Sequence, residues 1–141
     1  MTTINPYLTF PGNCREAMTF YQECLGGELT LQAVADSPMA SQWPREVQHN
    51  ILHSSLMKNT MMIMGSDMAG AEGIQKGNQI SLSLTCHNID EARDFFNNLA
   101  RGGQVVHSLH DFFNGTIGAL IDKYGMTWML FCPKKHMADK N

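Results

Sequence analysis

Apolar and polar residues follow two different periods along this chain. In "ISLSLT" (80–85) every second residue is apolar, which is the pattern of a strand with one buried face. Elsewhere apolar residues recur every three or four positions, as on the buried face of a helix: Ala17, Phe20, Tyr21 and Cys24 in one segment, and Ala92, Phe95, Phe96 and Leu99 in another. A glycine pair follows each of these segments and predicts its end.

The two predicted helices begin in the same way. "NCREAMTFY" (13–21) and "NIDEARDFF" (88–96) share Asn, Glu, Ala and Phe at equal places, shifted by 75 residues from Asn13 to Asn88. Such a match indicates an internal duplication. Each Asn can cap a helix, and a Glu three residues later can reach back to it, so we predict a capping box at both helix starts.

Strand-like segments surround the helices in both halves. The short run "PYLTF" precedes the first helix, as "ISLSLT" precedes the second. Three further strands are expected after each helix, at 28–34, 47–56 and 60–66 in the first half and at 104–109, 118–122 and 126–132 in the second. Lys58-Asn59 and Lys123-Tyr124-Gly125 look like hairpin turns. Each half is therefore predicted to be βαβββ.

This arrangement predicts an α+β fold of two tandem βαβββ modules. The 141 residues fall within the usual size of one domain, so we expect a single domain over 1–141. Its parts are module one at about 4–66, a linker at about 67–78, module two at about 79–133 and a polar tail at 134–141.

Composition removes several classes of partner. The net charge is −3 and no basic cluster offers itself to phosphates, so we expect no nucleic-acid partner. No apolar run approaches the ~20 residues of a membrane span, and the N-terminus lacks a signal-peptide pattern. We therefore expect a cytoplasmic protein with no membrane partner. The four cysteines form no C-x-x-C pair and are expected to be free thiols.

The histidines raise the question of a metal. "HNILH" places His49 and His53 four apart; in a strand they would share a face but lie ~13 Å apart, too far for one ion. His107 and His110 are three apart and would point to opposite faces of a strand. Neither pair is predicted to chelate a metal.

The segments "PYLTFPGNCREAMTFYQECLGGEL" and "GALIDKYGMTWML" resemble the glyoxalase/bleomycin-resistance/dioxygenase group, also called vicinal oxygen chelate proteins, and within it the PhnB-like branch. The resemblance covers residues 4–133. It implies a curved mixed sheet whose concave face is the ligand site, and a homodimer. Metal-dependent members draw His, Gln or Glu from the first and last strands of each module. The positions that look equivalent here, Pro6, Ser81, "TMMIMG" and "MTWMLF", offer no such ligand, so no metal and no cofactor are predicted.

Six residues are candidates for the ligand pocket: His49, Asp67, Trp43, Phe112, Phe113 and Trp128. The PhnB-like resemblance implies a histidine at the start of the third strand, where His49 would donate to an anion or act as a base; otherwise it is a histidine hydrogen-bonded within the sheet. Asp67 either orients a ligand at the cavity mouth or caps the linker. The four aromatic residues would supply apolar walls, or pack in the core and lid.

Two further features bear on the predicted pocket and on possible chemistry, namely the segment 112–115 and Cys14. The PhnB-like branch shows Phe-Trp-Gly-Asp where this chain has "FFNG" (112–115), which implies a different pocket shape. Cys14 follows the proposed cap, where helix N–H groups would favour its thiolate.

The leading hypothesis is a protein that binds a small organic or anionic molecule in the sheet cavity without an obligatory metal. The first alternative is a metal-dependent lyase or dioxygenase that uses a divalent ion. The second is a 3-demethylubiquinone methyltransferase, as proteins resembling this one are sometimes labelled, although "GSDMAGAEG" has no convincing helix after it to form a nucleotide-type site. A third is a sequestration protein without turnover.

Overall fold

The computed structural model of this protein describes residues 1–134. These residues divide into two compact units, Met1–Lys76 and a second that begins at Gly77. The boundary falls within the predicted linker. The expectation of one domain over 1–141 stays a prediction, and the predicted polar tail lies outside the described residues except for Lys134.

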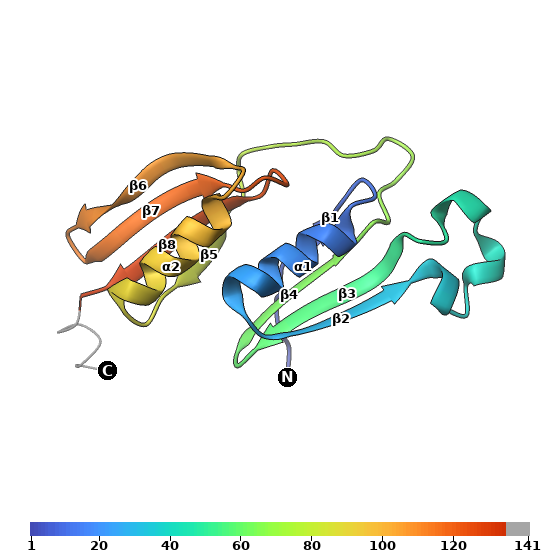
Figure 1. Ribbon diagram of the computed structural model, residues 1–141, viewed down its shortest axis with the longest axis horizontal. Helices are drawn as coiled ribbons and strands as arrows, with labels where there is room; N and C mark the ends of the chain where they lie inside the picture. Colours follow the sequence, from blue (N-terminus) through green and yellow to red (C-terminus); the bar gives the residue numbers. More distant parts are fainter. Residues whose placement is uncertain (135–141) are drawn as a thin grey trace. The chain divides into compact units, whose positions relative to one another are not determined.

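Unit one holds four strands and one α-helix (Figure 1). In chain order they are β1 (Tyr7–Thr9), α1 (Cys14–Leu25), β2 (Glu28–Ala33), β3 (Ile51–Lys58) and β4 (Met61–Ser66), with three single turns of 3-10 helix between β2 and β3 at Val34–Asp36, Ala40–Gln42 and Arg45–Val47. The sheet order is β1-β4-β3-β2. β1 runs parallel to β4, and the other pairs are antiparallel.

Unit two repeats this plan without the long loop. It contains β5 (Leu82–Thr85), α2 (Ile89–Ala100), β6 (Gln104–Phe112), β7 (Gly115–Ile121) and β8 (Thr127–Pro133). The sheet order β5-β8-β7-β6 matches that of unit one strand for strand, again with one parallel pair. The predicted α+β class with two βαβββ modules is therefore confirmed, and so are the hairpin turns, at Asn59 with φ +54° and at Gly125 with φ +90°.

Each helix packs on one face of its own sheet, where the core of the unit lies (Figure 1). In unit one, a Cβ on Gly65 would lie 3.4 Å from the Met18 sulfur of α1. In unit two, a Cβ on Gly118 would lie 2.9 Å from the Phe96 ring of α2, closer than such contacts occur. Glycine at these two positions lets the helices approach the sheets closely.

The other face of each sheet is called the open face here, because the helix of its unit does not cover it. Strand alternation and register place residues on it. In unit one these are Tyr7, Thr9, Glu28, Thr30, Gln32, His53, Ser55, Met57, Met62 and Met64. In unit two they include Ser83, Thr85, His107, His110, Ile117, Ala119, Met129 and Phe131.

Of the two predicted capping boxes, only the second forms, and only in part, because Glu91 reaches the backbone N–H of His87 instead of that of the N-cap Asn88. Asn88 accepts a hydrogen bond from the Glu91 backbone N–H at 2.9 Å, and the Glu91 carboxylate accepts one from the His87 backbone N–H at 3.2 Å. Asn13 makes no side-chain cap, and its Oδ1 is buried without a hydrogen-bond partner. The prediction for the first helix was wrong because a residue distant in sequence caps that helix instead.

Candidate functional site

The distant residue is Asp67, which follows β4 and is only 8% exposed. Its Oδ1 accepts hydrogen bonds from the backbone N–H groups of Gly12 (3.0 Å) and Cys14 (2.9 Å), at the start of α1. Its Oδ2 accepts one from Ile51 N–H at 2.8 Å, at the start of β3. Both carboxylate oxygens are thus engaged by backbone groups at the starts of α1 and β3, which differs from the predicted cap of the linker. The orientation of a ligand by Asp67 stays a prediction.

The third predicted strand begins later than expected, so the prediction that His49 lies on it was wrong. β3 starts at Ile51, and His49 is an exposed residue of the preceding turn. The reason is the loop: Arg45–Val47 forms a 3-10 turn after Pro44, and the Gln48 amide donates to the carbonyls of Ala40 and Trp43, both at 2.9 Å. The backbone is therefore turned, not extended, from Arg45 to Asn50. His49 and His53 consequently share no strand.

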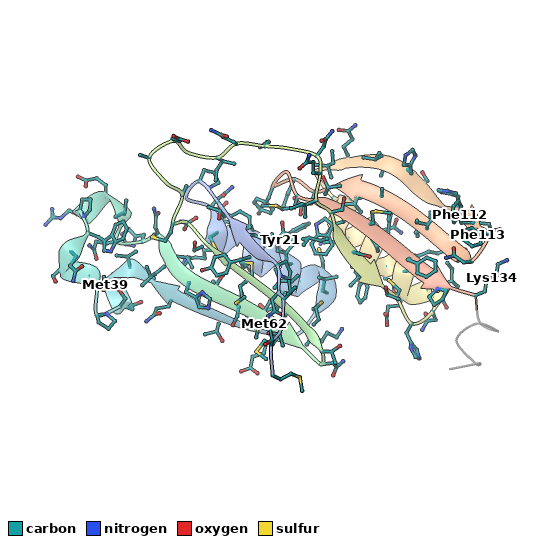
Figure 2. All side chains as sticks on the ribbon, turned by 180° about the vertical axis from the view of Figure 1, so that it is seen from behind. Tyr21, Met39, Met62, Phe112, Phe113 and Lys134 are labelled. Carbon is teal, nitrogen blue, oxygen red and sulfur yellow. The ribbon has the colours of Figure 1, made fainter. Side chains whose placement is uncertain are left out.

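Trp43 belongs to the same loop and is 38% exposed. Met39, marked in Figure 2, is 40% exposed a few residues earlier. Two large apolar side chains therefore stand partly uncovered in the loop between β2 and β3. This position is compatible with the predicted contact to a ligand, and the contact itself stays a prediction.

His53 meets an unexpected partner on the open face of unit one. Its Nδ1 lies 3.0 Å from the hydroxyl oxygen of Tyr7, and the two ring centroids are 5.7 Å apart. Tyr7 is in β1 and His53 in β3, and β4 lies between those strands in the sheet. The pair thus reaches across a strand. We name it the Tyr7–His53 pair.

Three methionines lie on the same open face as this pair. Met64 is the register partner of Tyr7, and Met57 is paired with Met62 on the neighbouring strands. Met57 is 48% exposed, and Figure 2 marks Met62 on unit one. Thioethers are polarizable and conformationally adaptable, so such a face can fit apolar molecules of varied shape.

The aromatic candidates of unit two lie in different surroundings. Phe112 and Phe113 are 49% and 76% exposed at the β6–β7 turn, with ring centroids 4.9 Å apart (Figure 2). Trp128 is only 2% exposed and lies on the helix side of the sheet, since its partners are Leu82 and Leu120. Its indole N–H donates to Asp122 at 2.8 Å. Trp128 is therefore a core residue, whereas the two phenylalanines are accessible.

The prediction that His107 and His110 face opposite ways was wrong. The register pairs His107 with Ala119 and His110 with Ile117, two residues apart on β7. A register shift between the two histidines accommodates the extra residue, so both partners lie on the open face. The sequence period alone misses such a bulge.

Burial, not the helix terminus, has the largest effect on the pKa of the Cys14 and Cys86 thiols. Desolvation raises the pKa of Cys14 to about 11, against a smaller lowering effect of its hydrogen bond with Ser54. Desolvation also raises the pKa of Cys86 to about 12. The expected stabilisation of a Cys14 thiolate was wrong because its side chain is fully buried. All four cysteines are free, as predicted.

The donor set on the open faces does not fit the metal that the glyoxalase-like fold implies. The first and last strands present Tyr7 and Met64 in unit one, and Ser83 and Met129 in unit two. Pro6 and Ser81, the positions expected from sequence, precede their strands. Hydroxyls and thioethers are poor ligands for zinc, iron or manganese. No group of three or more His, Cys, Asp or Glu within residues 1–134 is arranged to hold an ion.

Two βαβββ modules, each with a helix on one face of a mixed sheet, define a glyoxalase-like fold. The chain belongs to the family described as 3-demethylubiquinone-9 3-methyltransferase, whose model matches residues 2–131, and it is similar to a solved PhnB protein. Its fold is the one found in proteins of the glyoxalase/bleomycin resistance/dioxygenase superfamily. The resemblance stated from the sequence is confirmed.

Solved structures and a curated protein support this assignment. Protein PA1353 from Pseudomonas aeruginosa is 35% identical with a TM-score of 0.84, over 94% of this chain and 98% of the other. A putative 3-demethylubiquinone-9 3-methyltransferase, PhnB protein, from Bacillus cereus is 25% identical with a TM-score of 0.74, over 93% and 99%. Protein YjdN of Escherichia coli (strain K12) is 27% identical over 90% of this chain and 92% of its own length.

The wider superfamily is represented by structure alone. A glyoxalase/bleomycin resistance protein/dioxygenase family enzyme from Burkholderia phytofirmans PsJN has a TM-score of 0.63 at 11% identity, over 91% of this chain and 97% of the other. At this identity the likeness concerns the fold only. Within residues 1–134, neither α-helix has the length and apolar character needed to span a bilayer.

Proposed function

We propose that this protein binds a small organic molecule, with an apolar body and an anionic or carbonyl oxygen, on the open face of its sheets without an obligatory metal. The observation that carries this proposal is the composition of the open face of unit one. Met57, Met62 and Met64 lie on that face, which also carries two exposed polar side chains, Tyr7 and His53. An adaptable apolar surface with few polar groups is typical of small-molecule sites.

The accessible aromatic side chains have a secondary role in this proposal. Trp43 supplies an apolar contact at the edge of the open face of unit one, and Phe112 and Phe113 do so at the edge of the open face of unit two. His49, exposed in the turn before β3, is kept as a polar contact only. Asp67 and Trp128 act through the fold, because backbone groups and Asp122 already occupy their polar atoms.

The metal-dependent alternative is disfavoured by the donor set described above. The methyltransferase alternative needs a site for a nucleotide-sized cofactor, which usually lies where a strand, a Gly-rich turn and a helix follow one another. The Gly-rich segment 65–73 leaves β4 and continues as turns and coil without a helix. Both alternatives predict properties that differ from those of simple binding, namely a retained metal ion or a cofactor-dependent reaction.

The proposal includes a homodimer and a cytoplasmic location, with neither nucleic acid nor membrane as partner. Dimerisation is supported by the superfamily, and the absence of a nucleic-acid partner by the net charge of −3. Native mass spectrometry of protein purified without chelator tests both the oligomer and the metal. We expect a dimer of bare chain mass; one metal ion per chain would contradict the metal-free proposal.

Ligand binding is tested by methionine-methyl NMR with two probes of equal shape, cinnamate and cinnamamide. We expect the methyl signals of Met57, Met62 and Met64 to shift with at least one probe. Met62→Gln should weaken probe binding about tenfold, because a buried thioether contact is lost. Met39→Gln, the control at a methionine of the loop, should change binding by less than about twofold. Equal effects of the two variants would contradict the proposed face.

A further inference from the structure

The Tyr7–His53 pair is accessible on the open face of unit one. Tyr7 is 47% exposed, and His53 is exposed too. A hydrogen bond between accessible side chains adds only about 0.5–1.5 kcal/mol to stability. Two rings are nevertheless oriented toward each other across β4, with an oxygen–nitrogen distance of 3.0 Å.

The pair offers a hydrogen-bond donor in either protonation state of the imidazole. If the neutral imidazole carries its proton on Nε2, the Tyr7 hydroxyl donates to Nδ1 and Nε2–H is available as a donor; if it carries the proton on Nδ1, Nδ1–H donates to the Tyr7 oxygen and the phenol proton is available. In the protonated state Nδ1–H donates to the Tyr7 oxygen, and the phenol proton becomes available to another acceptor. A ligand oxygen near the pair thus always meets a donor.

The neighbouring groups on the open face indicate what kind of oxygen fits. Gln32 is the register partner of His53 and adds amide donors. Glu28 is the acidic residue of this face, and it lies four positions from Gln32 on β2, ~13 Å along the strand. A ligand anion at the pair therefore avoids close repulsion by Glu28. Met57, Met62 and Met64 on β3 and β4 offer an apolar surface on the same face.

We propose that the Tyr7–His53 pair, with Gln32, holds the carboxylate of an aromatic or otherwise apolar carboxylic acid whose body lies on Met57, Met62 and Met64. This assignment rests on the proposed function and adds the substrate class and the residues that select it. No covalent step is involved. The pair distinguishes a carboxylate from a neutral isostere because an ionised acceptor forms stronger hydrogen bonds than an amide oxygen.

The test measures the preference for cinnamate over cinnamamide in titrations followed by the methionine methyl signals. For the unchanged protein we expect cinnamate to bind about tenfold more tightly. Tyr7→Phe keeps the ring but removes the hydroxyl, and His53→Gln removes the imidazole; each should reduce the preference to less than about threefold. The double variant should lose little more than either single variant, because the two groups act as a unit.

His87→Gln is the matched control, since His87 is an exposed histidine of unit two. It should retain the full preference. The methyl signal of Met18, which is 0% exposed beneath the sheet of unit one, reports whether each variant keeps its fold. If Tyr7→Phe and His53→Gln keep the Met18 signal and the preference for cinnamate, the inference is overturned.

Failure of the proposed function gives a different result. If neither probe shifts Met57, Met62 or Met64, both the proposed function and the inference are overturned. If both probes shift those signals with equal affinity in the unchanged protein, the proposed function stands and the carboxylate assignment falls. Shifts that depend on protein concentration without any probe would mean that a second copy covers this face, and would overturn both.

Discussion

The two units share a strand order but stabilise the start of their helices differently. In unit two the cap is local, because Asn88 accepts from the N–H of Glu91, three residues away. In unit one the cap comes from Asp67, 53 residues beyond Cys14. A repeated sequence motif, here Asn-x-x-Glu, therefore does not ensure a repeated hydrogen bond. In unit one a carboxylate from a distant part of the chain accepts the backbone N–H groups at the helix start instead.

The difference extends to a second buried carboxylate. Asp122 of unit two also uses both oxygens, with Oδ1 accepting from the N–H groups of Tyr124 and Met126 and Oδ2 from the Trp128 indole. All three donors lie within six residues of Asp122. Asp67 therefore joins segments distant in sequence, whereas Asp122 organises one hairpin and one core side chain.

The largest expected effect is that of Asp67→Ala. It leaves two buried backbone N–H groups, of Cys14 and Ile51, and one partly buried N–H group, of Gly12, without their charged acceptor, so we expect the free energy of unfolding to fall by about 3–5 kcal/mol. Asp67→Asn, which keeps an acceptor oxygen, should cost less. Hydrogen exchange should show lost protection at the starts of α1 and β3, with unit two unchanged. Equal loss of protection in both units would contradict the assignment of Asp67 to the stability of unit one.

Trp128→Phe tests the corresponding carboxylate of unit two. The change keeps an aromatic ring in the core but leaves Asp122 Oδ2 without the indole N–H, so we expect a loss of about 1–3 kcal/mol. Chemical denaturation gives the magnitude, and hydrogen exchange should confine the loss to the β7–β8 region. A loss as large as that of Asp67→Ala would mean that the local contacts of Asp122 and the distant contacts of Asp67 contribute equally to the free energy of unfolding.

The two asparagines provide a direct pairwise test. Asn88→Ala should lower stability by about 1 kcal/mol, as loss of an N-cap does. Asn13→Ala should change it by less than about 0.5 kcal/mol, because its Oδ1 has no hydrogen-bond partner to lose. Thermal unfolding of the two variants measures both losses of stability. A larger loss for Asn13→Ala than for Asn88→Ala would contradict the cap described for α1.

The smallest effect concerns the thiols. The folded-state pKa values of Cys14, about 11, and Cys86, about 12, lie above the ordinary value of 9.0. The folded state therefore prefers the neutral thiols, so stability is unaffected at neutral pH and falls as pH rises above about 9. Alkylation by iodoacetamide at pH 8 should be slow in the native protein and fast in denaturant. Rapid native labelling of Cys14 would show that its thiolate is accessible after all.

The sequence by itself determined the duplicated βαβββ plan, both helices and both hairpin turns. These depend on periodicity, glycine punctuation and local turn chemistry, which involve residues only a few positions apart. The capping residue Asn88 was predictable for the same reason, since its partner is three residues away.

Only the tertiary structure decided where the polar side chains act. Tyr7 and His53 are 46 residues apart and meet because β1 and β3 flank β4; Asp67 reaches α1 because β4 ends beside it. His49 lies outside β3 because the Gln48 side chain holds the preceding loop in a turned conformation. The register partners of His107 and His110 lie on one face of the sheet because the strand register shifts between the two histidines. Each outcome depends on long-range pairing or on a single inserted residue, and neither is encoded in the local pattern of apolar and polar positions.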